Sequence, residues 1–262
     1  MTPTPKVILP ARAKLNLDLH VAGRRDDGFH ELRTTFQAID LHDLLEITTT
    51  PGGETALTTS GLEIPDVGEN AVLQAHRALE KVVGRALPAH FRLHKRIPPG
   101  SGMGGASSDA AAALRGLKSL HRLEVDLRPV AMRTGADVAF FLSGGRAEAR
   151  GRGDVLTQLP SHPDWFAIAW PGVRLSTAAV YKSWDDVGGE PPNDLRRAAE
   201  RVEPRLKDFA TLLAGVRGPE KWQLTGSGSA FFRRCESQTE ATEVAAALTC
   251  WTAVSCAVDA WG

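Results

Sequence analysis

A glycine-rich stretch at residues 98–109 carries the clearest chemical signal in the sequence. It reads Pro-Pro-Gly-Ser-Gly-Met-Gly-Gly-Ala-Ser-Ser-Asp and leads into an alanine-rich run that predicts a helix beginning near Ser107. Glycine lets the backbone turn freely and lets a ligand approach the main chain closely. A helix N-terminus offers unpaired N–H groups and a partial positive charge. The stretch therefore predicts a phosphate-binding loop.

The loop differs from two familiar nucleotide-binding patterns. It lacks the Gly-x-x-x-x-Gly-Lys-Ser/Thr order of a P-loop. A dinucleotide fingerprint needs an acidic residue about 20 residues further on, after a strand. Glu124 and Asp126 lie near that distance, but no strand is predicted there. A flexible linker is the remaining alternative, and linkers seldom run directly into so regular a helix.

Two other segments place charged groups where they could act on a ligand. Residues 13–21 are apolar at every second position, which predicts a half-buried strand. Lys14 and Asn16 share the polar side of that strand, although an ordinary solvent-facing strand would also explain them. Asp137 precedes the apolar run Val-Ala-Phe-Phe-Leu, where it could simply cap a short helix.

Further candidates carry less information on their own. Residues 24–28 read Arg-Arg-Asp-Asp-Gly, which predicts a tight turn, and Phe29 and His30 follow it directly. Asn70 precedes an amphipathic helical pattern and is explained equally well as its N-cap. Lys95 falls in the apolar row of a strand over residues 91–97, which predicts a position near the strand end or facing a ligand.

Composition limits the class of protein. The 262 residues have a formal net charge of zero, whereas a general nucleic-acid binder usually has a basic excess. The three cysteines form no Cys-x-x-Cys pair, which indicates a reduced, intracellular protein without zinc. The N-terminus has no signal-peptide pattern, and no apolar run approaches the ~20 residues that span a bilayer. We therefore expect a cytoplasmic protein that binds neither nucleic acid nor membrane.

The remaining patterns mix strands and helices without regular alternation, which predicts an α+β fold. Besides residues 13–21 and 91–97, strands are predicted at about 31–39, 44–50, 166–170, 222–224, 230–232 and 252–258. Helices are predicted at about 71–82, 107–120, 126–134, 177–181, 194–202, 205–214 and 239–248, with Gly135 closing the 126–134 helix at its C′ position. The break at Gly151-Arg152-Gly153 predicts two domains, 1–152 and 153–262.

Two glycine motifs together resemble those of the GHMP kinases, the family of galactokinase and of homoserine, mevalonate and phosphomevalonate kinases. The ATP-binding motif is matched by Pro98-x-Gly100-x-Gly102-Met103-Gly104-Gly105-Ala106-Ser107-Ser108-Asp109-Ala110. The C-terminal glycine motif is matched by Leu224-Thr225-Gly226-Ser227-Gly228-Ser229-Ala230. The resemblance covers almost the whole chain in the right order. It implies a ribosomal-protein-like N-terminal domain and a ferredoxin-like C-terminal domain, with the active site in the cleft between them.

Other segments are similar to one branch of this family. That branch phosphorylates a cytidine diphosphate-linked methylerythritol in the non-mevalonate isoprenoid pathway. The matching segments are Ala11-x-Ala13-Lys14-Leu15-Asn16-Leu17, Asp27-Gly28-Phe29-His30-Glu31-Leu32, Gly135-Ala136-Asp137-Val138 and Asn193-Asp194-Leu195. Met103 stands where leucine is usual, Ala106 where a third glycine is usual, Phe29 where tyrosine is usual and Tyr181 where phenylalanine is frequent. The two aromatic exchanges keep their ring faces, so stacking on a cytosine should persist.

The resemblance also implies roles for individual residues. ATP would donate the phosphoryl group, accompanied by Mg²⁺ without a dedicated protein site, and the 2-hydroxyl of the methylerythritol would accept it. Asp137 would act as general base with Lys14 beside it. ATP would contact Asn70, Lys95, Pro98, Pro99, Gly100, Ser101, Gly102, Met103, Gly104, Gly105, Ala106, Ser107 and Ser108. The acceptor would contact Asn16, Phe29, His30, Thr177 and Tyr181, and the second glycine motif would shape the acceptor side of the cleft. A monomer or weak homodimer is expected.

Two other functions remain open at this point. A GHMP kinase for homoserine or mevalonate would share the ATP loop, but those acceptors have no base to stack on Phe29 and Tyr181. A non-catalytic RNA-binding module is a second possibility, because the N-terminal fold of the family resembles a ribosomal-protein domain. The zero net charge and the pairing of Lys14 with Asp137 argue against it.

Overall fold

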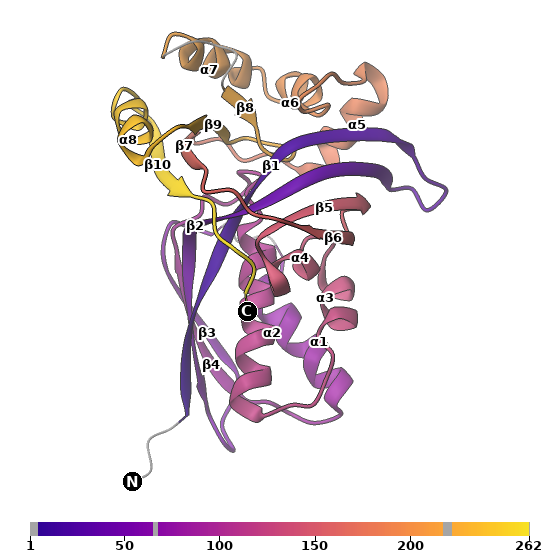
Figure 1. Ribbon diagram of the computed structural model, residues 1–262. Helices are drawn as coiled ribbons and strands as arrows, with labels where there is room; N and C mark the ends of the chain where they lie inside the picture. Colours follow the sequence, from indigo (N-terminus) through magenta and orange to yellow (C-terminus); the bar gives the residue numbers. More distant parts are fainter. Residues whose placement is uncertain (1–4, 65–67, 217–221, 262) are drawn as a thin grey trace.

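The computed structural model describes residues 5–64, 68–216 and 222–261 as an α+β fold with two β-sheets (Figure 1). The first sheet contains β1 (Lys6–Arg24), β2 (His30–Thr49), β3 (Ala56–Gly61), β4 (Ala89–Lys95), β5 (Arg146–Gly151) and β6 (Val155–Leu159). Its order is β3-β4-β2-β5-β6, with β1 paired to β2. Four helices pack against it, α1 (Ala71–Val83), α2 (Gly105–His121), α3 (Arg128–Thr134) and α4 (Val138–Ser143).

The second sheet has the order β10-β7-β9-β8. Its strands are β7 (Trp165–Trp170), β8 (Trp222–Leu224), β9 (Phe231–Cys235) and β10 (Trp251–Cys256). Helices α5 (Thr177–Val187), α6 (Arg196–Val202), α7 (Arg205–Ala214) and α8 (Gln238–Ala246) surround this sheet (Figure 1). The α+β class predicted from the sequence is confirmed. No helix in the described part of the chain is long and apolar enough to cross a membrane.

Strands β1 and β2 form one long antiparallel ribbon that reaches both sheets (Figure 1). Residues 44–49 of β2 pair with β4, and residues 32–37 pair with β5 in the half of the ribbon next to its hairpin turn. In that same half, β1 bonds to the loop before α6: the Leu19 N–H donates to the Pro192 carbonyl and the Val21 N–H donates to the Asp194 carboxylate, both at 2.9 Å. The ribbon therefore connects the two halves of the fold.

The prediction of two strands at 31–39 and 44–50 was wrong, because β2 continues from His30 to Thr49. The acidic residues between them suggest a loop, but their carboxylates are hydrogen-bonded to neighbouring segments. Asp40 accepts a hydrogen bond from the Cys256 N–H at 2.9 Å, and Asp43 accepts one from the Ile97 N–H at 2.8 Å. Tertiary bonds thus allow polar residues inside a strand that local pattern alone would interrupt.

Several element boundaries also differ from the predictions. Strands β3, β5 and β6 were missed; β5 reads Arg-Ala-Glu-Ala-Arg-Gly, so its buried side chains are only alanines. Helix α2 begins at Gly105 rather than near Ser107. Gly135 ends α3 with a φ of 175°, an extended conformation, so the predicted left-handed C′ glycine is absent there. The predicted boundary between residues 152 and 153 lies in the turn joining β5 and β6, and the division into two domains stays a prediction.

Three groups of buried apolar residues support the site. One lies between the first sheet and α1–α4, and a second lies between the second sheet and α5–α8. A third joins the two sheets and contains Leu15, Met103 and Phe166, each fully buried. The strand that carries Lys14 and the loop that carries Met103 are therefore fixed to one another by a shared core.

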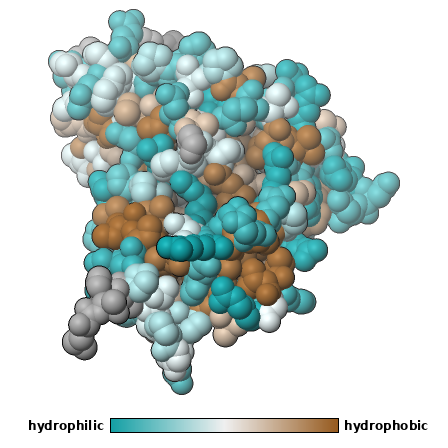
Figure 2. Space-filling view, turned by 60° about the horizontal axis from the view of Figure 1, so that its bottom comes forward, coloured by the Kyte–Doolittle hydropathy of each residue, from teal (hydrophilic) through white to brown (hydrophobic). Residues whose placement is uncertain are grey.

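On the face shown in Figure 2, apolar surface is divided into patches by hydrophilic residues.

Candidate active site

A cleft of about 1570 Å³ lies where the glycine loop, the β1–β2 ribbon and α5 meet. Most of the predicted site residues line it. They are Lys14, Asn16, Phe29, His30, Asn70, Lys95, Pro98, Pro99, Gly100, Ser101, Gly102, Gly104, Gly105, Ala106, Ser107, Asp137, Thr177 and Tyr181. Met103 and Ser108 do not line it: Met103 is part of the core, and Ser108 is buried inside α2.

The glycine loop presents a helix N-terminus to this cleft. Gly104 is the N-cap of α2 with a left-handed φ of 71°, a conformation that strongly favours glycine. The N–H groups of the next three residues, 105–107, precede the first intrahelical hydrogen bond and are free to bind an anion. The Ser108 N–H donates to the Gly104 carbonyl at 2.9 Å, so this backbone N–H is already used inside the helix.

The second glycine segment, residues 225–229, packs directly against the first. The Ala230 N–H donates to the Ser101 carbonyl at 2.9 Å. Gly102 has a φ of 82°, and a Cβ added there would lie 2.2 Å from the Thr225 carbonyl oxygen. Close approach of two backbones explains why both segments are rich in glycine. The second segment also reaches α5, because the Ser227 and Thr177 hydroxyls are hydrogen-bonded at 3.0 Å.

Lys14 and Asp137 meet on the floor of the cleft. The Lys14 Nζ lies 3.6 Å from the Asp137 Oδ2 and donates to the Asn16 Oδ1 at 2.5 Å. The Lys14 side chain is 5 % exposed and that of Asp137 is 30 % exposed. Burial lowers the pKa of Lys14, and the charge of Asp137 partly opposes that shift. The cleft thus contains a buried ammonium and a carboxylate that solvent or a ligand can reach.

The ordinary explanations of these residues do not hold. Lys14 and Asn16 are buried, at 4 % and 3 % exposed, so they do not lie on a solvent-facing strand. Asp137 occupies the N-cap position of α4, but its side chain makes no capping hydrogen bond. A hydrogen bond from the Lys14 N–H to the Met103 carbonyl, at 3.0 Å, holds the strand against the glycine loop.

Beneath the loop, Lys95 lies between two carboxylates that sequence reasoning missed. Its Nζ contacts Asp43 and lies 2.7 Å from the Asp109 Oδ2, and all three side chains are buried. Burial raises the pKa of Asp109 to about 8, with Asp43 adding to that shift and Lys95 opposing it. Asp109 stands within the loop motif itself, but no local pattern indicates that residues 43 and 95 lie beside it. Asn70, at the outer end of the cleft, accepts a hydrogen bond from the Val72 N–H at 2.9 Å and so caps α1.

Aromatic rings gather at the end of the cleft formed by α5 and the tip of the β1–β2 ribbon. The rings of His30 and Tyr181 stack with centroids 4.9 Å apart, and the His30 Nε2 lies 2.7 Å from the Asp185 Oδ1. Burial raises the pKa of Tyr181, and Asp137 adds to that shift. Phe29 is 53 % exposed. The end of the cleft therefore offers one stacked pair and one open ring face to a planar ligand.

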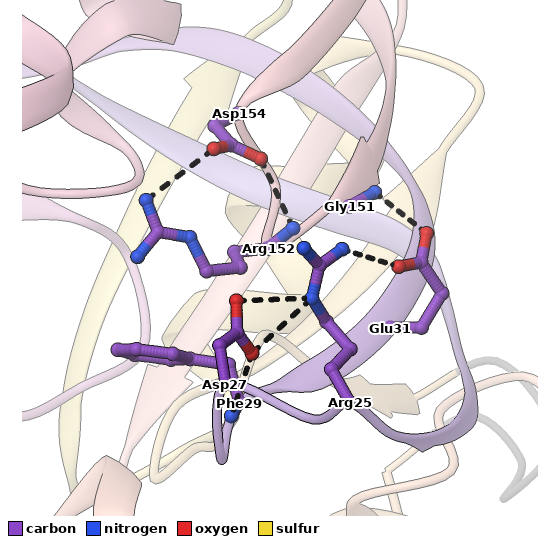
Figure 3. A network of polar contacts seen from close by, with 7 residues as sticks. All are labelled: Arg25, Asp27, Phe29, Glu31, Gly151, Arg152 and Asp154. Carbon is purple, nitrogen blue, oxygen red and sulfur yellow. Dashed lines mark hydrogen bonds and ion pairs between the residues drawn. The ribbon is translucent and has the colours of Figure 1, made fainter.

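A polar network fixes the tip of the ribbon beside the turn after β5 (Figure 3). Arg25 bonds to Asp27 at 3.3 Å and to Glu31 at 2.7 Å, and Glu31 accepts a hydrogen bond from the Gly151 N–H at 3.0 Å. The Arg152 guanidinium lies 4.8 Å from the centre of the Phe29 ring. Sequence reasoning identified this turn as a break in the chain and did not assign its arginine to the site.

Comparison with known proteins agrees with this geometry. Residues 70–145 match the family model described as the GHMP kinases N terminal domain. A 4-diphosphocytidyl-2-C-methyl-D-erythritol kinase of Pseudomonas syringae pv. syringae is 37 % identical, covering 94 % of this chain and 91 % of the relative. The enzyme of that name from Chromobacterium violaceum is 36 % identical, covering 90 % and 88 %.

Solved structures give the same result. A crystal structure of a 4-(cytidine 5'-diphospho)-2C-methyl-D-erythritol kinase has a TM-score of 0.78 and 35 % identity, covering 98 % of this chain and all of that one. Homoserine kinase from Cytophaga hutchinsonii has a TM-score of 0.70 at 19 % identity, covering 99 % and 96 %. At that identity the second likeness concerns the fold alone.

Proposed function

We propose that this chain phosphorylates the 2-hydroxyl of 4-diphosphocytidyl-2-C-methyl-D-erythritol. The chain belongs to the 4-diphosphocytidyl-2-C-methyl-D-erythritol kinases of the GHMP family. The chain is an ATP-dependent kinase, and the product would continue along the non-mevalonate isoprenoid pathway. The single observation that supports the chemistry is the Lys14–Asp137 pair, 3.6 Å apart in the cleft that the α2 N-terminus also lines.

The donor side of the cleft suits a triphosphate. The free N–H groups of residues 105–107 would bind phosphate oxygens, with the α2 dipole adding a favourable potential. Lys95 lines the same part of the cleft, where its two carboxylates fix its position. Asn70 would lie near the adenine. Predicted contacts through Met103 and Ser108 are dropped from this proposal, because neither residue lines the cleft.

In the chemical step, Asp137 would accept the proton of the attacking hydroxyl. As the O–H bond breaks, the hydroxyl oxygen bonds to the γ-phosphorus, the bond from that phosphorus to the bridging oxygen breaks, and ADP leaves. Lys14 would stabilise the negative charge that develops on the transferred group. Phosphoryl transfer depends mainly on positioning and charge stabilisation, and Lys14 is held in position by the buried Asn16 and the Met103 carbonyl.

The acceptor side suits a planar base. Phe29 and Tyr181 would hold the cytosine, and His30 would bond to its edge. Asn16 and Thr177 would contact the methylerythritol portion, since both line the cleft. Tyr181 stacks on His30 and lines the cleft, where its ring would contact the base.

Magnesium fits this cleft as a companion of ATP. No group of three His, Cys, Asp or Glu side chains suited to a metal is present in the part of the chain that the structure describes. The loop supplies N–H donors, which bind anions rather than cations. Mg²⁺ would therefore take its ligands mainly from phosphate oxygens and water and supply charge neutralisation there. A cytoplasmic location and a monomeric or weakly dimeric state remain predictions.

A substrate comparison tests the proposal. ADP release would be measured by a coupled assay with the cytidylated methylerythritol, homoserine and mevalonate side by side. Turnover with the cytidylated substrate alone is expected, because the other two have no base for the aromatic end of the cleft. Turnover only with homoserine or mevalonate would overturn the acceptor assignment. Salt-dependent RNA retention without any turnover would instead favour the RNA-binding alternative.

A further inference from the structure

The acceptor that we propose has a diphosphate between its base and its reacting end, and this inference rests on that proposed function. The positively charged residues that line the cleft are Lys14, Arg24, Lys95, Arg152 and Lys182. Lys14 is paired with Asp137, and Lys95 with two carboxylates. Arg24, Arg152 and Lys182 remain as candidates for binding the diphosphate, and the cation that does so must lie between the base site and Asp137.

We propose that Arg152 binds this diphosphate and is a specificity-determining residue for the acceptor. Its guanidinium carbon lies 4.8 Å from the centre of the Phe29 ring, at the base site. The next residue, Gly153, lies against the reacting end, because a Cβ added there would be 3.6 Å from the Asp137 Oδ1. Arg152 thus spans the interval that a diphosphate has to cross between base and hydroxyl.

The guanidinium also has donors to spare. Its Nη2 lies 3.5 Å from the Asp154 Oδ2, which is a long contact, and the Arg152 side chain is 33 % exposed. A guanidinium has five N–H donors in a planar fork. Within the described residues, Asp154 is the carboxylate at ion-pair distance from it, and Asp27 interacts with its charge from further away. The fork geometry matches two oxygens of a phosphate, and such charge-assisted pairs are among the stronger hydrogen bonds.

The surrounding turn holds Arg152 in place before any ligand arrives. The Arg152 N–H donates to the Asp154 Oδ1 at 3.0 Å, and the preceding Gly151 N–H donates to Glu31. Figure 3 shows the guanidinium between the Phe29 ring and Asp154. Because Glu31 and Phe29 both belong to the β1–β2 ribbon, the base site and the diphosphate site are tied together. Such preorganisation lowers the cost of ordering the arginine on binding.

Calorimetric titration of cytidine and of cytidine diphosphate separates the two sites. The proteins compared would be wild type, Arg152→Ala, Arg152→Lys and the control Arg150→Ala, whose side chain is 61 % exposed and bonded to Glu148 outside the cleft. We expect Arg152→Ala to weaken cytidine diphosphate about 10- to 100-fold, the range for a hydrogen-bonded charge, and to leave cytidine affinity unchanged. Arg152→Lys should lose less, since it keeps the charge but not the fork. Arg150→Ala should match wild type.

Each other outcome has a distinct meaning. Equal losses for cytidine and cytidine diphosphate would show that Arg152 only supports Phe29, and would overturn the inference. An unchanged ratio of the two affinities in Arg152→Ala would overturn it as well. A wild-type protein that binds neither compound and does not phosphorylate the cytidylated acceptor would refute the proposed function itself. In steady-state assays, the variant should raise KM for the acceptor by the same factor while KM for ATP stays constant.

Discussion

Replacing Asp137 by asparagine keeps the shape of the side chain and removes the proposed base. We expect kcat to fall by about 10²- to 10⁴-fold, the usual contribution of a general base, which corresponds to about 2.7–5.4 kcal/mol of activation free energy. The KM for ATP should change little, because the N–H groups of the α2 N-terminus bind the donor without Asp137. The acceptor KM should also stay near its wild-type value.

The same substitution should alter the titration of Lys14. At the 3.6 Å separation, two unit charges attract by about 5 kcal/mol for an effective dielectric constant near 20, before desolvation is subtracted. Asp137 raises the pKa of Lys14 against the effect of burial. Removing it therefore lowers that pKa further, so the variant loses its remaining activity at a lower pH on the alkaline side.

Coupled ADP-release kinetics between pH 6 and pH 10 would measure both effects. Asp208→Asn provides a matched control, because Asp208 is exposed in the first turn of α7, outside the cleft. Thermal unfolding by circular dichroism would verify that the Asp137 variant is folded. Turnover within about threefold of wild type would refute the assignment of Asp137 as general base, since removing a group that contributes 10²-fold or more must lower kcat by at least that factor.

Three further predictions follow from the cleft. Gly102→Ala should weaken ATP binding and lower the melting temperature, because the added Cβ would overlap the Thr225 carbonyl oxygen. Nucleotide titration measures the ATP affinity and calorimetry measures the melting temperature. Wild-type values for both would contradict the close packing of the two glycine segments. Burial raises the pKa of Asp109 to about 8, so between about pH 4 and pH 8 the folded protein keeps a proton on Asp109 that the unfolded chain has lost. The free energy of unfolding should therefore decrease as the pH rises through this range, by at most about 1.4 kcal/mol per pH unit from Asp109. Urea unfolding at several pH values should show a flatter profile for Asp109→Asn, and an unchanged slope would count against this linkage. Tyr181→Ala should raise the acceptor KM about tenfold, as expected from the loss of one stacking partner that contributes about 1–1.5 kcal/mol. Tyr181→Phe should keep an acceptor KM near that of wild type. An equal rise of the acceptor KM in the two variants would indicate a role of the tyrosine hydroxyl instead.

The parts of the site that depend on local sequence could be predicted well. The glycine loop and the helix after it form a contiguous segment whose chemistry is local, and the structure has both. The pairing of Lys14 with Asp137 was different: 123 positions separate them in the sequence, and their proximity came only from the family resemblance. Periodicity locates a residue on a face of its own element, and it does not say which distant element covers that face.

The missed residues show the same limit. Asp43 and Asp109 resemble ordinary polar positions, and their importance comes from burial around Lys95. Arg152 lies in a turn that the sequence marks as a break, and only the folded ribbon brings Phe29 to it. The single long strand β2 was also divided in the prediction, because the tertiary hydrogen bonds that satisfy its acidic residues are invisible to local pattern.

The long β1–β2 ribbon has a consequence for synthesis on the ribosome. Its strands emerge early, yet the Val21 N–H bonds to a carboxylate 173 residues later in the chain. Leu19 and Val21, which are both buried in the second core, must stay uncovered until that segment has been made. Contacts so distant in sequence form slowly, and exposed apolar strands are sites of misassembly in the meantime. The nascent chain therefore carries the β1–β2 hairpin as an unprotected ribbon through most of translation, and the cleft forms only near the end.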